Sequence, residues 1–210
     1  MPRAPRIQEA GYVHHVVCRG NDRQPLFNSK KDFQTYLEFL EEARKQYPLN
    51  VYNFCLMDNH LHLLVEPKEE GAMSKVMEMV SKAYAKYFNK TYNRVGHLFQ
   101  GRFKSFLIQS ERYFFACSRY IDLNPVKANI ADDPKNYTWS GHSWLAYGKE
   151  PSIKVDMHEL YNGLGHNSAE RQVAYRALVA NYHGDELDLL DRRAGVLGDE
   201  DFKDKVKKLV

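Results

Sequence analysis

Residues 51–66 decide the fold, and they read VYNFCLMDNHLHLLVE. Two apolar runs of strand length, 51–57 and 60–66, flank Asp58-Asn59, a dipeptide that favours a tight turn. The segment therefore predicts two antiparallel strands joined as a β-hairpin.

The second strand of this hairpin carries His60-Leu61-His62. Residues two apart in a strand point to the same side, so both imidazoles face one way and Leu61 faces the other. Two imidazoles held by one rigid strand form half of a site for a divalent metal. The alternative is two ordinary strand histidines, since nine histidines in 210 residues make a chance pair common.

Periodicity and turn residues place further elements on both sides of the hairpin. Ser29 is suited to cap the start of a helix that Pro48 ends, and Pro125 is expected to end a later helix. Strands are expected at 12–17, 51–57, 60–66 and 98–108, and helices at 30–47, 71–93 and 111–123. This order predicts an α+β chain with a ferredoxin-like antiparallel sheet and helices on one face.

Composition changes near residue 150. The sequence from 151 onward is acidic and helical, most clearly at 172–181 and 201–209. We therefore expect a main domain at 1–150 and a C-terminal helical extension at 151–210. The basic pair Arg192-Arg193 in the extension is more typical of a structural role than of a primary DNA site.

The totals exclude several classes of protein. The net charge is +3, and the excess of Lys and Arg lies in residues 1–150, so this part is the one suited to meet a polyanion. Three widely spaced cysteines without a CxxC pair exclude a disulfide framework and a zinc knuckle. The first residues lack the apolar core of a signal peptide, and no apolar run is long enough to cross a membrane. We expect a cytoplasmic protein without a membrane partner.

A second group of chemically capable residues lies in RYIDLNP, residues 119–125. Tyr120 and Asn124 are four apart and share one helix face. The phenol of Tyr120 is a candidate nucleophile and the amide oxygen of Asn124 a candidate metal ligand. The alternative for Tyr120 is a half-buried helix aromatic, as for most of the 14 tyrosines. Tyr113, two turns earlier on the same face, competes as nucleophile.

These blocks together resemble a known family. The stretches LMDNHLHLLVEP, GHLFQGRFKSFLI and RYIDLNPVKA are similar to the REP-associated tyrosine transposases, as are HHVVCRGNDRQPLF and YTWSGHSWLAYG. These transposases belong to the HUH superfamily, whose signature is a histidine, a hydrophobic residue and a histidine. The resemblance spans residues 10–150, and the tail is similar to the helical extension of some members.

The resemblance implies an activity and a site. His60 and His62 would bind Mg²⁺ or Mn²⁺, Tyr120 would be the nucleophile and Asn124 the third metal ligand, a position that is Gln in related transposases. The tyrosine would form a 5′-phosphotyrosine with single-stranded DNA and release a 3′-OH, whose reverse attack rejoins strands. Substrates would be hairpin-bearing DNA of the kind found in REP palindromes, handled by a monomer or a homodimer associated with the nucleoid.

Other residues are weaker candidates for DNA contact. Basic and polar side chains suited to phosphates or bases are Arg19, Asn21, Arg102, Lys104 and Arg119. Aromatic side chains that would stack on unpaired bases, or else pack in the core, are Phe99, Phe103 and Phe106. His15 is either an outer support of the metal site or, more typically, a packed strand histidine.

Two other functions stay open at this point. One is a non-catalytic protein that binds DNA hairpins through the same cleft. The other is a metal-dependent hydrolytic nuclease in which Tyr120 is structural and Asp58 or Glu66 activates water.

Overall fold

The predicted hairpin forms the start of the sheet. The structure is a computed structural model and describes residues 10–181 and 196–207. Strand β2 (Leu49–Met57) pairs antiparallel with β3 (His60–Pro67), and Met57 lies opposite His60 beside the turn. This prediction is therefore confirmed, with each strand only slightly longer than expected.

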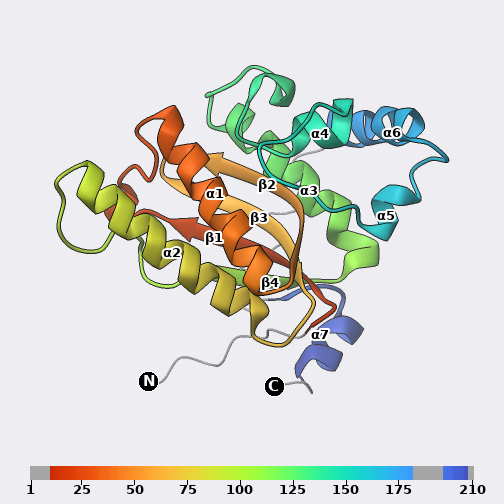
Figure 1. Cartoon of the computed structure of the whole chain (residues 1–210). Helices are drawn as coiled ribbons and strands as arrows, with labels where there is room; N and C mark the ends of the chain where they lie inside the picture. Colours follow the sequence, from red (N-terminus) through yellow and green to blue (C-terminus); the bar gives the residue numbers. More distant parts are fainter. Residues whose placement is uncertain (1–9, 182–195, 208–210) are drawn as a thin grey trace.

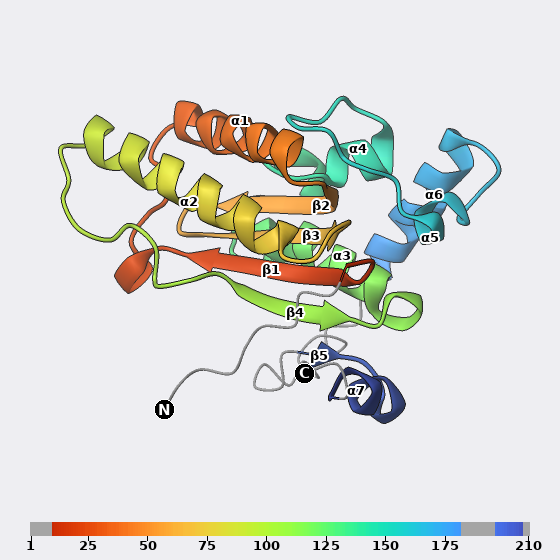
Figure 2. The ribbon, with the colours of Figure 1, turned by 60° about the horizontal axis from the view of Figure 1, so that its bottom comes forward.

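Three further strands complete the sheet. β1 (Val13–Arg19) lies between β3 and β4 (Lys104–Ile108), and the order is β2-β3-β1-β4-β5. The first four strands are antiparallel and have the ferredoxin-like order. The short β5 (Val196–Leu197) adds a parallel strand at the β4 edge (Figure 2). The predicted fold class is thus confirmed, and the parallel edge strand is an addition to it.

Two helices cover one face of the sheet, as expected. α1 (Lys30–Gln46) and α2 (Ala72–Thr91) lie side by side in front of the strands in Figure 1. The carboxylate of Asp32 accepts hydrogen bonds from the N–H groups of Asn28 and Ser29 at the start of α1. Gly71 begins α2 with a φ of 74°, a conformation that glycine adopts without strain.

The next helix, α3 (Ser110–Lys127), covers the opposite face of the sheet (Figures 1 and 2). The expectation that Pro125 ends it was wrong, because Pro125 lies inside the last turn. Proline removes one N–H, but the following turn closes through the N–H of Ala128 and the carbonyl of Asn124, 3.0 Å apart. The helix ends at Lys127, and Asn129, two residues further on, has a left-handed φ of 55°.

The segment before β4 is less regular than predicted. Only Lys104–Ile108 form the strand, whereas Phe99 makes a single bridge to Gly20. Gly101 interrupts this segment with a left-handed φ of 71°. Residues 98–103 therefore cross the end of β1 as a loop.

Short helices follow α3 along the chain. They are α4 (His142–Tyr147), α5 (Glu159–Asn162), α6 (Ser168–Ala180) and α7 (Glu200–Lys207). A 3₁₀ turn at Pro134–Asn136 lies between α3 and α4, and another at Asn21–Arg23 precedes α1. The helices expected at 172–181 and 201–209 correspond to α6 and α7, while residues 208–210 and Arg192-Arg193 lie outside the described part of the chain. Val155, Tyr161 and Tyr175 join the same apolar core as α1 and α2. The boundary at 150 stays a prediction.

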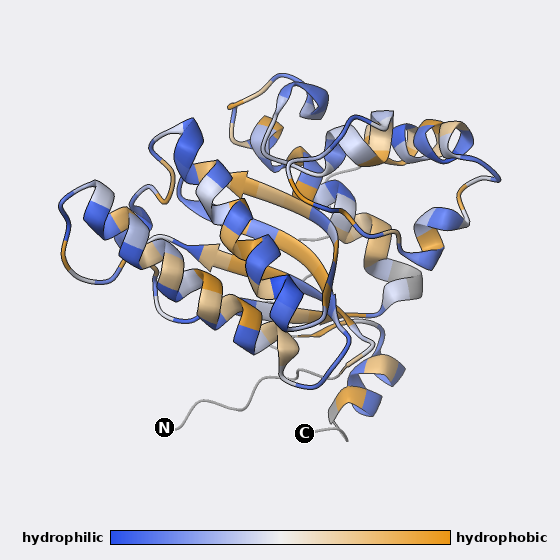
Figure 3. Cartoon of the chain, viewed as in Figure 1, coloured by the Kyte–Doolittle hydropathy of each residue, from blue (hydrophilic) through white to orange (hydrophobic). Residues whose placement is uncertain are grey.

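Each face of the sheet has its own apolar core. Val16, Leu61 and Leu63 pack under α1 and α2, whereas Leu64 packs with Cys117 and Ile121 of α3. Figure 3 shows largely apolar strands beside helices in which hydrophilic and hydrophobic residues alternate. In the described residues, no helix combines the length and the apolar composition needed to cross a membrane.

Candidate active site

A pocket of about 350 Å³ opens on the sheet face that α3 covers. It brings together six residues that the sequence singled out, from three strands, one loop and one helix: His60, His62, Arg19, Arg102, Lys104 and Tyr120. His15, Val17, Gln100 and Phe106 complete its lining. Among these described lining residues there are three basic side chains and no acidic one, so the pocket suits an anion.

Strand register explains why these side chains meet. In the central strand β1, Arg19 lies opposite His60, and Val17 lies opposite both His62 and Lys104. Because alternate residues of a strand share a face, these positions on three strands all point toward α3.

Tyr120 reaches the pocket from α3. Its ring centre lies 5.5 Å from that of His62 and 5.9 Å from that of His15. The Nζ atom of Lys127 lies 5.1 Å from the centre of the same ring, so a positive charge accompanies the candidate nucleophile. Tyr113 is on α3 as well but does not line the pocket.

The surroundings of His60 favour a neutral imidazole whose Nε2 atom can bind a metal. The side-chain nitrogen of Asn59 donates to the carbonyl of Arg23 at 3.2 Å, which turns the amide oxygen toward His60. That oxygen is 2.7 Å from Nδ1 of His60, so Nδ1 carries the proton and Nε2 keeps its lone pair. Burial, and secondly the positive charge of Arg19, hold the pKa of His60 below its usual value.

His62 is hydrogen-bonded to another histidine, His15. Its Nδ1 atom is 2.9 Å from Nε2 of His15, and the two rings are stacked with centres 5.1 Å apart. A single proton lies between these two nitrogens. When Nδ1 of His62 holds it, Nε2 of His62 keeps a lone pair, as in His60. The ring centres of His60 and His62 are 5.0 Å apart.

This donor set fits a divalent metal. Two neutral imidazoles on one strand, each with its other ring nitrogen in a hydrogen bond, have the chemistry of a metal-binding pair. In residues 10–181 and 196–207 no cluster of three or more His, Cys, Asp or Glu side chains has metal-binding geometry. The remaining ligands would therefore be an amide oxygen, water or a bound phosphate.

The structure does not bring Asn124 or Arg119 into the pocket lining. The side-chain nitrogen of Asn124 donates to the carbonyl of Tyr120 at 2.6 Å, so the amide folds back on its own helix. The guanidinium of Arg119 is buried and donates to the carbonyl of Leu178 in α6 at 3.2 Å. Asn124 would need a different rotamer to serve as the third ligand.

A larger groove of about 860 Å³ adjoins this pocket and shares Arg19 and Arg102 with it. It lies between α2 and the loop at 96–103, and Asn21, Phe99 and Phe103 also line it. Phe99 and Phe103 are half-buried against the core, whereas Phe106 lines the first pocket. The candidate DNA residues thus divide between two connected hollows.

The carboxylates considered for water activation lie elsewhere. Glu66 accepts hydrogen bonds from Tyr52 and Lys68, and six residues of strand place it roughly 20 Å from His60. Asp58 is exposed in the hairpin turn, and neither residue lines the pocket.

Sequence reasoning missed one side chain of the site, Lys127, and left the role of another, His15, open. Lys127 is seven residues after Tyr120, two helical turns along the same face, and the expected helix end at Pro125 concealed this relation. For His15 the sequence left two alternatives, an outer support of the metal site or, more typically, a packed strand histidine, and its contact with His62 agrees with the first. Its position opposite Leu64 in β3 and Phe106 in β4 was the available signal, but it depends on strand order.

Comparisons with known proteins identify the fold and the family of the chain. The fold is similar to the solved structure of a REP-associated tyrosine transposase bound to a REP hairpin, with a TM-score of 0.60 and 18% identity over 75% of this chain and 93% of that chain. No curated protein matches the sequence. A family model described as IS200-like transposase matches residues 9–124, which include His15, the two β3 histidines and Tyr120. Because this match covers more than half of the chain, the chain belongs to the IS200-like transposase family.

Proposed function

We propose that this transposase cleaves and rejoins single-stranded, hairpin-bearing DNA through a covalent bond between Tyr120 and a 5′ phosphate. The observation that supports this most is the meeting of Tyr120, His60 and His62 around one basic pocket. A phosphodiester is an anion of suitable size for such a pocket, and its three basic side chains would hold it.

The proposed step exchanges one phosphate ester for another. The phenolic oxygen of Tyr120 forms a bond to phosphorus while the bond from phosphorus to the 3′ oxygen breaks. The phenol loses one proton and the leaving 3′ oxygen gains one. Because the phosphotyrosine keeps the energy of the broken bond, attack by a 3′-OH reverses the step without ATP.

His60 and His62 would hold Mg²⁺ or Mn²⁺ through their Nε2 atoms. When bound, this cation would polarise the phosphate as a Lewis acid. Asn59 orients His60, and His15 orients His62, so each ligand keeps one ring position. Asn124 stays our candidate for a third ligand from the protein.

The path of the DNA follows from the two connected hollows. Arg19 and Arg102 lie where the pocket meets the groove, and they would contact the phosphates next to the cleaved one. Phe99 and Phe103 in the groove offer aromatic surface to unpaired bases. The hairpin in the similar solved complex supports a hairpin as the flanking structure.

One copy of the chain supplies Tyr120 and both histidines to the pocket. A second copy is therefore not needed to assemble these groups, which supports a reaction within a monomer.

A denaturing gel tests the proposal with labelled single-stranded hairpin DNA from the flanks of the gene and Mg²⁺ or Mn²⁺. We expect a protein–DNA adduct in the unaltered chain. Tyr120→Phe should lower its yield by at least about a thousandfold while native-gel binding persists. Tyr113→Phe, the matched control two turns earlier on α3, should form the adduct normally.

Other outcomes identify the alternatives. An adduct in Tyr120→Phe that is lost in Tyr113→Phe would assign the nucleophile to Tyr113. Hairpin binding without an adduct, across several hairpins and both metals, would favour the binding protein. Cut DNA without an adduct would favour a hydrolytic nuclease.

A further inference from the structure

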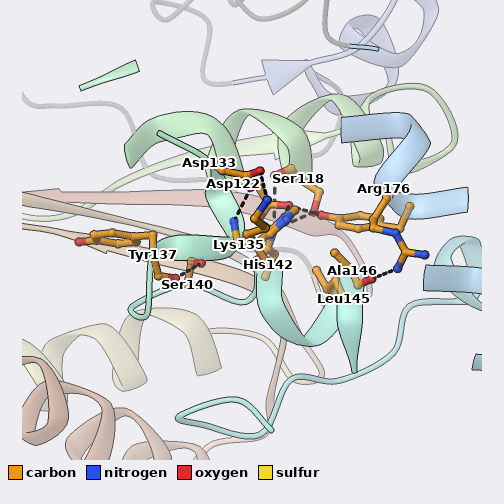
Figure 4. A network of polar contacts seen from close by, with 12 residues as sticks. Ser118, Asp122, Asp133, Lys135, Tyr137, Ser140, His142, Leu145, Ala146 and Arg176 are labelled. Atoms are coloured by element: carbon orange, nitrogen blue, oxygen red, sulfur yellow. Dashed lines mark hydrogen bonds and ion pairs between the residues drawn. The ribbon is translucent and has the colours of Figure 1, made fainter. Parts of the chain in front are cut away.

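A buried polar network joins α3 to β2, α4 and α6, and Figure 4 shows its residues Ser118, Asp122 and His142. Its centre is the carboxylate of Asp122, which is 0% exposed. Oδ2 of Asp122 accepts from the hydroxyl of Tyr175 at 2.6 Å and from Nδ1 of His142 at 2.9 Å. Oδ1 accepts from the side-chain nitrogen of Asn53 at 2.8 Å. Elements β2, α4 and α6 thus meet at one residue of α3.

The network holds α3 at a second point one turn earlier. Oγ of Ser118 is 2.7 Å from the hydroxyl of Tyr175 and 2.8 Å from the side-chain nitrogen of Asn53. One assignment of hydrogen-bond donors satisfies the whole network. In it Ser118 donates to Tyr175, Tyr175 donates to Asp122, and Asn53 donates to both α3 residues. The Tyr175 hydroxyl therefore joins the two anchoring points.

The position of these anchors matters for Tyr120. Ser118 and Asp122 are four apart on one helix face, and Tyr120 lies midway between them on the opposite face. A side chain that reaches roughly 8 Å from the helix axis moves by roughly 3 Å when the helix turns by about 20°. An error of about 1 Å between reacting groups slows a reaction by about a hundredfold.

We propose that Tyr175 is a positioning residue for the nucleophile: its hydroxyl, by bridging Ser118 and Asp122, fixes the rotation of α3 that presents Tyr120 to the bound phosphate. This inference rests on the proposed function. Buried polar networks add little net stability compared with apolar packing, but they select one arrangement of the elements that they join. Here the selected arrangement includes the reactive helix and α6, beyond residue 150.

The test separates the rate of the chemical step from DNA affinity and from folding. Tyr175→Phe removes only the hydroxyl. We expect the rate of adduct formation at saturating hairpin DNA to fall by about tenfold or more, while native-gel affinity changes less than about twofold. Tyr161→Phe is the matched control, because its hydroxyl is buried in the same aromatic cluster but donates to Leu145 at 2.6 Å, not to α3. Its rate should stay within about twofold of the unaltered chain.

Ser118→Ala provides the second variant. It removes the other end of the bridge, and the double variant with Tyr175→Phe should be no slower than the slower single variant, because both break one connection. An unchanged rate in Tyr175→Phe, an equal loss in Tyr161→Phe, or additive losses in the double variant would overturn the inference. If Tyr175→Phe fails to fold, a normal rate in Ser118→Ala overturns it. Absence of an adduct in the unaltered chain would instead refute the proposed function, and this inference with it.

Discussion

The two faces of the sheet use the same strands for different purposes. Toward α1 and α2, β1 and β3 present Val16, Leu61 and Leu63, each 0% exposed, in a closed apolar core. Toward α3 the same two strands present His15, His60 and His62 around an open pocket. The difference shows how one strand can carry stability on one side and chemistry on the other, because its side chains alternate.

The largest expected effect is the contrast between alanine substitutions at two adjacent residues of β3, His60 on the pocket side and Leu61 on the core side. His60→Ala should lower adduct formation by at least about a hundredfold and change the free energy of unfolding by less than about 1 kcal/mol. Leu61→Ala should destabilise the fold by about 2–5 kcal/mol, because it leaves a cavity under α1 and α2. The denaturing gel, run on protein kept below the unfolding transition, measures adduct formation, and urea unfolding measures the free energy of unfolding.

The comparison breaks if the two variants behave alike. A large loss of stability in His60→Ala would mean that the pocket face also supports the fold. A lost adduct in folded Leu61→Ala would mean that the closed core controls the site.

A smaller effect should appear at Asp32, a buried carboxylate at the start of α1 on the side of the apolar core. The carboxylate of Asp32 accepts from the hydroxyls of Tyr87 and Tyr92 at 2.8 and 2.6 Å. Burial raises the pKa of Asp32, but the bonds from Tyr92, Asn28, Tyr87 and Ser29 together outweigh it and lower that pKa. Asp32→Asn should cost about 1–3 kcal/mol at pH 7.

The pH dependence has a definite sign. Because the folded pKa of Asp32 lies below the unfolded value of about 3.9, its stabilisation is complete above that value and is lost as the pH falls through the folded pKa. The stability difference between the unaltered chain and Asp32→Asn should therefore shrink in strong acid. A difference that stays constant down to pH 2 would argue against an ionised Asp32.

The smallest effect concerns Arg102, an exposed basic side chain that lines the pocket on the α3 side of the sheet. Arg102→Ala should weaken hairpin binding by about tenfold at low salt and reduce the slope of log affinity against log salt by about 1. Lys86→Ala is the control, since Lys86 is exposed on α2 and lines neither hollow. Equal salt slopes for both variants would mean that the DNA does not meet Arg102. Binding measurements between about 50 and 200 mM salt resolve this.

Local sequence signals predicted most of the fold. The turn at Asp58-Asn59 and the cap at Ser29 mark real element ends, because each acts through its own backbone conformation. Pro125 did not end α3, since one missing hydrogen bond near the last turn is a small cost for a helix packed on a sheet.

The site was predicted less completely than the fold, because several of its contacts join elements that are far apart in the sequence. His60, His62 and Tyr120 were identified by spacing and resemblance, and the structure places them around one pocket. The contacts of His15, Lys127 and Arg119 depend on which elements lie next to theirs, and spacing along the chain does not contain that information.

The parallel pair of β4 and β5 also bears on solubility. Leu107 of β4 lies opposite Val196 and packs with Val206 of α7, and Gln109 exchanges two hydrogen bonds of 2.9 Å with Asp199. An uncovered strand edge is a template on which another chain can add a strand. The segment 196–207 therefore shields this end of the edge from aggregation, and a chain cut short before it would expose both the edge and Leu107.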